Sequence, residues 1–313
     1  MTTSSGTSID GRDRVPRPLG DADVPACLAL TRAAGWNQTA DDWRMMLERG
    51  VGWGIETADA SALAASTVVL PFERPARGTG GGFAWISMVL VLPQARGNGL
   101  ATRLLSHALQ WLHARDTLPI LDATPAGEPV YRRAGFTPAL GLRRFRRAAP
   151  VHPQGHDQHA AKGSAPPPSC RIRRVEARDW PALGALDATV FGGDRSAILR
   201  ALAGRMPSGA LLAEGDAGLE GYVFARDGHA MHQVGPLVAA RDATALALLD
   251  AALVDIPAAC CVDLMDHRGP LQAALEARGF AIERPFSRML LGAGRALPGD
   301  AGAVVLAAGP ELG

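Results

Sequence analysis

Apolar and polar positions alternate along the first half of the chain in a way that predicts a compact α/β domain. Apolar residues at helical spacing predict a first helix, and Thr39 followed by two acidic residues is typical of the N-cap of a second. Apolar or alternating runs bounded by Gly and Pro then predict strands. The expected order is helices at 22–34 and from 39, strands at 51–56, 62–70 and 85–92, a helix at 101–112, a strand at 120–123, a helix at 129–133 and a strand region at 136–146.

The second half begins with a similar layout, which predicts an internal duplication. Pro236 can be set against Pro93, and Gly279-Phe280 against Gly135-Phe136, so that the two halves come into register. A period of well over a hundred residues indicates duplicated domains rather than a solenoid. The elements expected here are strands at 172–175, 222–225, 233–238 and 260–264, and helices from 179, at 243–253 and at 270–277.

A stretch rich in Ala, Pro, Gly and His separates the halves and predicts a linker. Three histidines within it, His152, His156 and His159, are better explained by a solvated low-complexity segment than by a metal site. The predicted organisation is an N-terminal tail at 1–16, a first domain at 17–147, the linker at 148–169, a second domain at 170–292 and a C-terminal extension at 293–313.

Two glycines, Gly97 and Gly99, mark a turn between an apolar run and an amphipathic helix. Glycine lacks a Cβ, so the backbone N–H groups of such a turn can approach a ligand closely. At a helix start these groups and the helix dipole favour an anion such as a pyrophosphate. The chain lacks the lysine pattern of a P-loop, and Thr102 stands where a dinucleotide fingerprint needs a third small residue.

The remaining pattern, [QR]xxGx[GA] with Gln94 in first place, resembles the CoA-binding loop of the GNAT family of acyl-CoA N-acyltransferases. A second motif supports this resemblance, since Tyr131 lies four residues before Gly135-Phe136. The resemblance implies two tandem GNAT-like domains, each a mixed, largely antiparallel α/β sheet flanked by helices. It also implies acetyl-CoA as co-substrate, bound by Met88, Val89, Val91, Gln94, Ala95, Arg96, Gly97, Asn98, Gly99, Leu100 and Ala101.

The chemistry expected from the resemblance is direct attack of an amine on the thioester. Tyr131 is the expected general acid, because a phenol can hydrogen-bond or protonate the departing thiolate. The fourth strand carries no acidic residue, so Asp122, Glu128 or a water-mediated route is left as the base. The fitting acceptor is a primary amine of a small molecule.

The second copy lacks both motifs. Residues 238–243 contain no glycine where the first half has its turn, and they include Asp242, which would repel phosphate. Leu275 stands at the position of Tyr131. We therefore expect a degenerate second domain that does not catalyse.

Three tryptophans of the first half, Trp36, Trp53 and Trp85, are candidates for the wall of the acceptor pocket. They favour an apolar or aromatic small amine. The cluster Arg143, Arg144, Arg146 and Arg147 is expected to be a solvated strand edge rather than a nucleic-acid site.

Composition excludes several other functions. A net charge of +1 over 313 residues gives no broad footprint for nucleic acid or an anionic membrane. No apolar run reaches the roughly 18 residues of a membrane span, and the polar start lacks a signal-peptide core, so we expect a cytoplasmic protein. We expect a monomer or a homodimer. The four cysteines have no zinc-site spacing and predict free thiols, with no metal required.

Two other functions fit the same sequence. A non-enzymatic acyl-CoA sensor would use the glycine turn to bind its ligand and the second domain to signal. A protein acetyltransferase acting on lysines or N-termini would need an open groove for its substrate.

Overall fold

The computed structural model describes residues 15–73, 82–149, 170–292 and 294–313, which fall into two compact units. The first unit contains the described residues up to Leu70 together with 88–111. The second contains those of 71–87 and of 112–313. These units do not coincide with the predicted domains 17–147 and 170–292, and most of the predicted linker lies outside the described residues, with its three histidines.

The first unit combines a small antiparallel sheet with three helices. Its strand β1 pairs with β2, and β2 pairs with β3, both antiparallel. Helix α2 begins after Thr39, whose hydroxyl accepts a hydrogen bond from the Asp42 N–H, so the predicted N-cap is confirmed. The elements are β1 (Arg17–Leu19), α1 (Val24–Ala33), α2 (Ala40–Arg49), β2 (Val51–Glu56), most of β3 (Leu63–Phe72), the end of β4 (Phe83–Val91) and α3 (Leu100–His113), of which the last two residues belong to the second unit.

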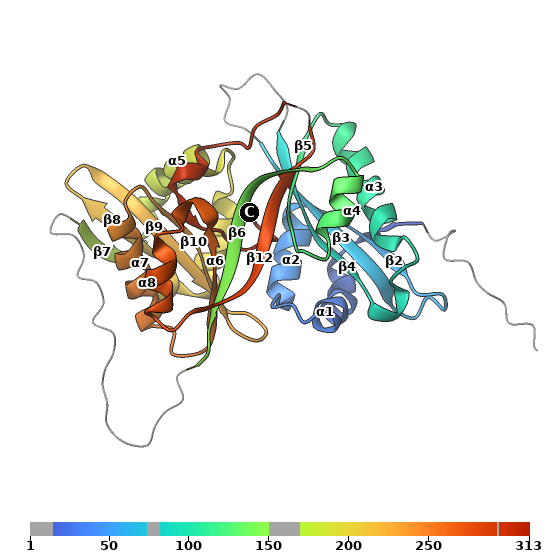
Figure 1. The fold of residues 1–313 in the computed structure, drawn as a ribbon, viewed down its shortest axis with the longest axis horizontal. Coiled ribbons are helices and arrows are strands. Elements are labelled where there is room, and N and C mark those ends of the chain that lie inside the picture. Colours follow the sequence, from blue (N-terminus) through green and yellow to red (C-terminus); the bar gives the residue numbers. More distant parts are fainter. Residues whose placement is uncertain (1–14, 74–81, 150–169, 293) are drawn as a thin grey trace, which may run out of the picture. The chain divides into compact units, whose positions relative to one another are not determined.

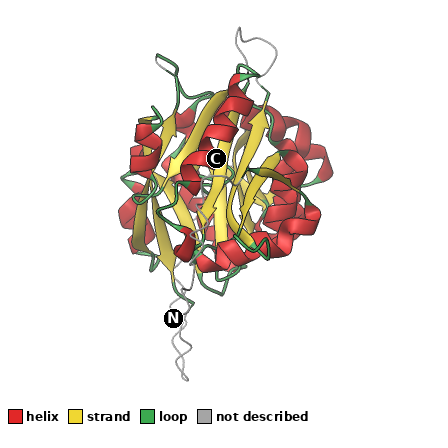
Figure 2. Cartoon of the chain, turned by 90° about the vertical axis from the view of Figure 1, so that its right-hand side faces the viewer, coloured by secondary structure: helices red, strands yellow, loops and turns green. Residues whose placement is uncertain are grey.

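The second unit is built on a long, mostly antiparallel sheet (Figure 1), in which β4–β5 and β10–β11 pair in parallel. The strand order is β4-β5-β12-β6-β11-β13-β10-β9-β8-β7. The strands are β5 (Leu118–Ala123), β6 (Thr137–Arg147), β7 (Cys170–Arg174), β8 (Leu211–Gly215), β9 (Gly218–Arg226), β10 (His232–Ala239), β11 (Cys260–Met265), β12 (Ala281–Leu290) and β13 (Val304–Leu306). The helices are α4 (Glu128–Arg133), α5 (Trp180–Phe191), α6 (Ser196–Arg205), α7 (Asp242–Val254) and α8 (Leu271–Glu276). Figure 2 shows this mixture of helices and strands, which confirms the predicted α/β class.

The two halves of the sequence exchange a strand within this sheet. Strand β12, from the second half, pairs with β5 and β6 of the first (Figure 1). Strand β6 in turn lies between β12 and β11. Strand β6 is therefore an interior strand, and Arg144 on it is only 6% exposed. The prediction of a solvated arginine edge is wrong for this residue, because its carboxylate partner, Asp263, comes from the other half of the sequence.

The C-terminal segment belongs to the same sheet rather than to a separate extension. Strand β13 pairs antiparallel with β10 and β11, and most residues from Val304 onward are buried. The pattern did not predict β1, β8, β12, β13 or α6, since each is short or only weakly periodic. On one side of β9, β10 and β11, leucines and alanines of α7 and α8 form a continuous apolar core with the strands.

In the described part of the chain, no helix is long and apolar enough to span a bilayer. The four cysteines are free, as predicted, and all four are buried.

Candidate functional site

The glycine turn lies between strand β4 and helix α3 of the first unit. Strand β4 ends at Val91, a short 3-10 turn covers Pro93–Ala95, and α3 begins at Leu100. Gly97 and Gly99 have φ angles of +81° and +71°, which only glycine adopts readily. A Cβ added at either position would meet no atom of the described residues within 4 Å, so the conformation, and not crowding by these residues, requires glycine there.

The backbone of this turn presents unused hydrogen-bond donors. Among the described residues, no hydrogen bond engages the N–H groups of Gly97, Asn98 or Gly99. The side chains of the turn instead donate inward, since Asn98 Nδ2 bonds the Ala95 carbonyl at 3.2 Å and Arg96 Nε the Val91 carbonyl at 3.4 Å. With the positive end of a 14-residue helix beside them, these N–H groups suit an anion.

Strand β4 is distorted just before the turn. Met88 has a φ of +51°, a left-handed conformation that is uncommon for a non-glycine residue within a strand. Its carbonyl accepts a hydrogen bond from the Ser66 hydroxyl at 2.9 Å instead of leaving a polar group unpaired. A local distortion of this kind re-aims the neighbouring backbone groups of a strand.

Tyr131 lies on the short helix α4 of the second unit, which follows β5. Its ring meets the edge of Phe136 with centroids 6.0 Å apart, and the side chain is half-buried. In the described residues its hydroxyl has no hydrogen-bond partner. Burial raises the pKa of this phenol to about 12, so it stays protonated and able to donate at physiological pH.

The raised pKa predicts how activity depends on alkaline pH. An acid whose pKa is raised keeps its proton to higher pH. If Tyr131 is the general acid that the sequence predicts, its contribution to activity should persist through pH 10 and fall only toward pH 12. The measurement is kcat/KM between pH 7 and 11, with the expected co-substrate acetyl-CoA and with Tyr131→Phe as the reference for other ionisations. A loss specific to the wild type with a midpoint near pH 10 would contradict the buried environment.

Asp122, one of the two candidate bases, is held in a buried ion pair. Both of its oxygens accept from Arg288, at 2.8 Å from Nε and 2.9 Å from Nη2, and the Asp122 side chain is 0% exposed. Arg288 in turn lies over the Trp85 ring, 4.4 Å from its centroid. This bidentate pair favours a structural role for Asp122 over that of a base.

Glu128, the other candidate base, begins helix α4 three residues before Tyr131. It accepts from Arg132 Nε at 2.8 Å in an i,i+4 pair. Its side chain is more accessible than that of Asp122, with 27% exposed.

Two of the three tryptophans proposed for the acceptor pocket belong to the core instead. Trp53 is 6% exposed and packs edge-on against His107 and Trp111 of α3, at centroid distances of 5.0 and 5.9 Å. Trp85 is 2% exposed, and its Nε1 donates to the Pro310 carbonyl at 3.1 Å. Helix α3 and the C-terminal segment cover these rings, so only the half-exposed Trp36 keeps the accessibility that a pocket wall needs.

In the second half, the connection that corresponds to the glycine turn is too short to form a similar anion-binding turn. Residues 92–99 separate β4 from α3, whereas only residues 240 and 241 separate β10 from α7. Asp242 at the start of α7 pairs with Arg268 Nη1 at 2.7 Å. Arg268 Nη2 also donates to the carbonyls of Ala239 and Gly302, so a network within the chain fills this helix start.

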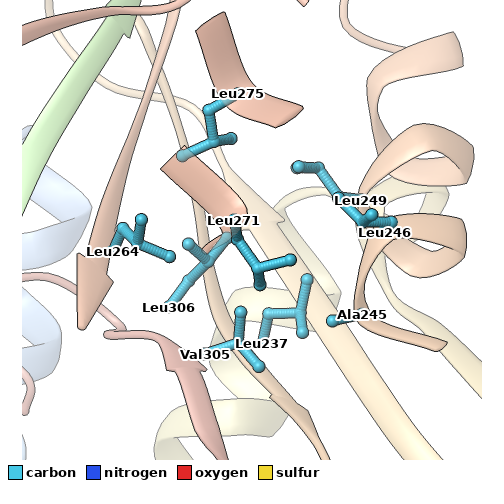
Figure 3. A pocket seen from close by; sticks show the side chains of 9 residues that line it. All are labelled: Leu237, Ala245, Leu246, Leu249, Leu264, Leu271, Leu275, Val305 and Leu306. Carbon is cyan, nitrogen blue, oxygen red and sulfur yellow. The ribbon is translucent and has the colours of Figure 1, made fainter. Parts of the chain in front are cut away.

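Strand β13 lies where β10 and β11 separate. These two strands pair in parallel only from His232 to Val234, and β13 then enters between them. A small pocket next to it, with Leu275 in its wall, is lined entirely by apolar side chains (Figure 3). The lining residues are Leu237, Ala245, Leu246, Leu249, Leu264, Leu271, Leu275, Val305 and Leu306.

A buried polar cluster that sequence analysis did not predict lies around Arg195. This guanidinium donates to Asp187 and, at 2.8 Å, to the Gly313 carbonyl, and the Tyr222 hydroxyl also bonds Asp187. Asp194 accepts from the Ser196 N–H at the start of α6, as an N-cap does. These contacts are structural, and the described residues contain no group of three or more His, Cys, Asp or Glu suited to a metal ion.

Comparison with known proteins agrees with the duplicated organisation. Two family models, each described as an acetyltransferase (GNAT) domain, match residues 15–139 and 183–304, and together they span more than half of the chain. The chain is 22% identical over 263 residues to the uncharacterized N-acetyltransferase YitH of Bacillus subtilis, which covers 84% of this chain and 86% of that protein.

Solved structures share the fold over nearly the whole length. A putative acetyltransferase from Pyrococcus horikoshii superposes with a TM-score of 0.74 at 16% identity, over 100% of this chain and 99% of the other. A tandem GNAT protein from the clavulanic acid biosynthesis pathway superposes with a TM-score of 0.64 at 16% identity, over 91% of this chain and 100% of the other.

Proposed function

This chain belongs to the GNAT family of acetyltransferases, with two such domains in tandem, and from that premise we propose that its first half transfers an acetyl group from acetyl-CoA to a primary amine of a small molecule. The observation that carries the proposal is the glycine turn before α3. Its three N–H groups are unused within the described chain, and they lie at the positive end of a long helix.

In this proposal the turn binds the pyrophosphate of CoA. The donors are the backbone N–H groups from Gly97 to Ala101, with Gln94 and Arg96 on the same exposed segment. The distorted part of β4, from Met88 to Val91, pairs with the amides of the pantetheine arm. Both assignments follow the family resemblance, and the conformation of the turn supports the first of them.

The reaction begins when the neutral amine attacks the thioester carbonyl carbon and forms a tetrahedral intermediate. The C–S bond then breaks, the CoA thiolate leaves, and the nitrogen gives up its proton. A reference thiol has a pKa of about 8.5, whereas that of Tyr131 is about 12, so complete proton transfer to the thiolate is uphill by roughly 3.5 pKa units. We therefore propose that Tyr131 stabilises the thiolate as a hydrogen-bond donor instead of giving it a full proton.

Water is the proposed route for the proton of the amine. Asp122 directs both oxygens to Arg288, and Glu128 is paired with Arg132. Solvent can carry the proton away without breaking either pair.

The second half is proposed to be catalytically silent. In the family, the pantetheine lies where the fourth and fifth strands separate, and in the second half β13 already lies between the corresponding β10 and β11. Two further features support the same conclusion. The connection between β10 and α7 has no glycine turn, and the pocket that Leu275 lines is apolar. One acetyl-CoA is therefore expected to bind per chain.

Replacement of Tyr131 by Phe tests the proposed reaction. The loss of a hydrogen bond to a charged thiolate should lower kcat about 10- to 100-fold, whereas the dissociation constant for acetyl-CoA should stay within about twofold. CoA release gives kcat with an acetylated amine, and calorimetry gives the affinity. If acetyl-CoA binds but no amine accelerates CoA release from the wild type, the protein is an acyl-CoA sensor instead.

A further inference from the structure

Arg284 is a half-buried arginine that has no carboxylate partner among the residues that the structure describes. It lies on β12, and in the described residues its guanidinium makes no hydrogen bond or ion pair. Its Nε is buried without a hydrogen-bond partner, and the guanidinium carbon lies 5.0 Å from the centroid of the Phe286 ring. The adjacent Glu283 is exposed and forms no ion pair with it.

The position of Arg284 in the sheet adds a repulsion. It lies directly opposite Arg144 in the pairing of β12 with β6, and like charges at such positions destabilise a sheet. Arg144 is satisfied, because it donates to both oxygens of Asp263 at 2.8 Å. Burial and the charge of Arg144 lower the pKa of Arg284 below its usual value.

The fully buried arginines of the same unit differ from Arg284 in this respect. Each of them is paired with a carboxylate. Arg147, which is half-buried like Arg284 and also has no carboxylate partner in the described residues, still donates from Nη2 to the Ile256 carbonyl at 2.9 Å. The pairs are Arg288 with Asp122, Arg144 with Asp263, Arg195 with Asp187 and Arg226 with Glu311. Arg284 is thus one positive charge in excess of these four neutral pairs.

The pairing of β12 with β5 places Arg284 beyond the carboxyl end of β5. Helix α4, which carries Tyr131, follows that end of β5 in the chain. Ser287 of β12 pairs with Ala123, the last residue of β5, in antiparallel fashion. Arg284 is therefore three residues, or about 10 Å, beyond the carboxyl end of β5. Helix α4, with Tyr131, begins five residues after the same end.

We propose that Arg284 binds an oxyanion of the acceptor, so that the acceptor is an amine that also carries a carboxylate or a phosphate group. This inference rests on the proposed acetyl transfer, since it assigns the substrate class of that reaction. A planar guanidinium with unused donors matches either oxyanion in bidentate geometry, and the bound anion would offset the repulsion from Arg144. Arg284 is then a specificity-determining residue, supplied to the site by the second half of the sequence.

The test uses the full-length chain with matched amines, assayed by CoA release. Phenylalanine carries a carboxylate that its amide and phenethylamine lack. Phosphoethanolamine carries a phosphate that ethanolamine lacks. The twenty amino acids complete the panel. In Arg284→Gln, KM for the anionic members that the wild type acetylates should rise about 10- to 100-fold, with KM for neutral members unchanged. Arg284→Lys should recover part of the loss, and Arg143→Gln, at an exposed position of β6, should have no effect.

Thermal shift with the same compounds separates failure of this inference from failure of the proposed function. Anionic members should raise the melting temperature of the wild type and of Arg143→Gln, but not that of Arg284→Gln. If these shifts in melting temperature are observed but no amine is acetylated, the oxyanion site is supported and the proposed acetyl transfer is rejected. The inference is overturned if neutral amines are the better substrates, if Arg284→Gln affects both classes equally, or if no anionic compound is either bound or acetylated.

Discussion

Replacement of Arg288 by Met is expected to destabilise the protein by about 3–5 kcal/mol. The substitution leaves the carboxylate of Asp122, whose side chain is 0% exposed, without a partner in the interior. It also removes the guanidinium that lies over Trp85. Because Asp122 belongs to β5 and Arg288 to β12, the size of the loss reports directly on the pairing of the two halves. Urea unfolding followed by tryptophan fluorescence measures it.

Two further variants make this prediction specific. The double variant Asp122→Leu, Arg288→Met removes both charges and should recover most of the stability, because a buried ion pair can often be replaced by apolar residues. Arg143→Met removes an exposed pair with Asp266, in which both side chains are more than 40% exposed, and should cost less than about 1 kcal/mol. A loss below 1 kcal/mol for Arg288→Met would show that β12 does not pair with β5 as described.

Local signals in the sequence predicted the local parts of the fold. Thr39 caps α2 as expected, and the run that begins at Ala101 is the helix α3 that the glycine turn requires. These features depend on residues within a few positions of one another, so spacing and side-chain chemistry suffice to find them. For the same reason the two glycine-dependent motifs were sufficient to indicate the GNAT family, which the family models confirm.

Contacts between distant parts of the chain could not be predicted in this way. Asp122 and Arg288 are 166 residues apart, and Arg144 and Asp263 are 119 apart. An arginine on a strand looks the same in the sequence whether its partner is water or a carboxylate from the other half. This is why Arg144 was expected at a solvated edge and Asp122 was considered as a base. Trp53 and Trp85 were misassigned to a pocket because the elements that cover them are not adjacent in sequence.

Replacement of Gly97 by Asp is expected to weaken the binding of acetyl-CoA by at least 100-fold. The new carboxylate would face the proposed pyrophosphate position and compete for the N–H groups that hold it, and each hydrogen bond to a charged group contributes roughly 1.5–3 kcal/mol. In the described part of the chain, a Cβ at this position meets no atom within 4 Å, so the substitution should not disturb the packing. Asp is also among the residues that tolerate a left-handed conformation, and the expected cost in stability is about 1–2 kcal/mol.

A second glycine provides a matched control for this variant. Gly294 has a φ of +71° and also has open space around its Cβ position, but it lies outside the turn. Gly294→Asp adds the same charge and a similar backbone strain, so it should bind acetyl-CoA as the wild type does. Melting temperatures of both variants confirm that any loss of binding is not caused by unfolding.

The most direct test of the account is calorimetric titration of acetyl-CoA into the wild type, Gly97→Asp and Gly294→Asp. We predict one site per chain for the wild type and for Gly294→Asp, and no measurable binding for a folded Gly97→Asp. Equal binding by Gly97→Asp and the wild type would contradict the assignment of the glycine turn as the site that holds the pyrophosphate of CoA.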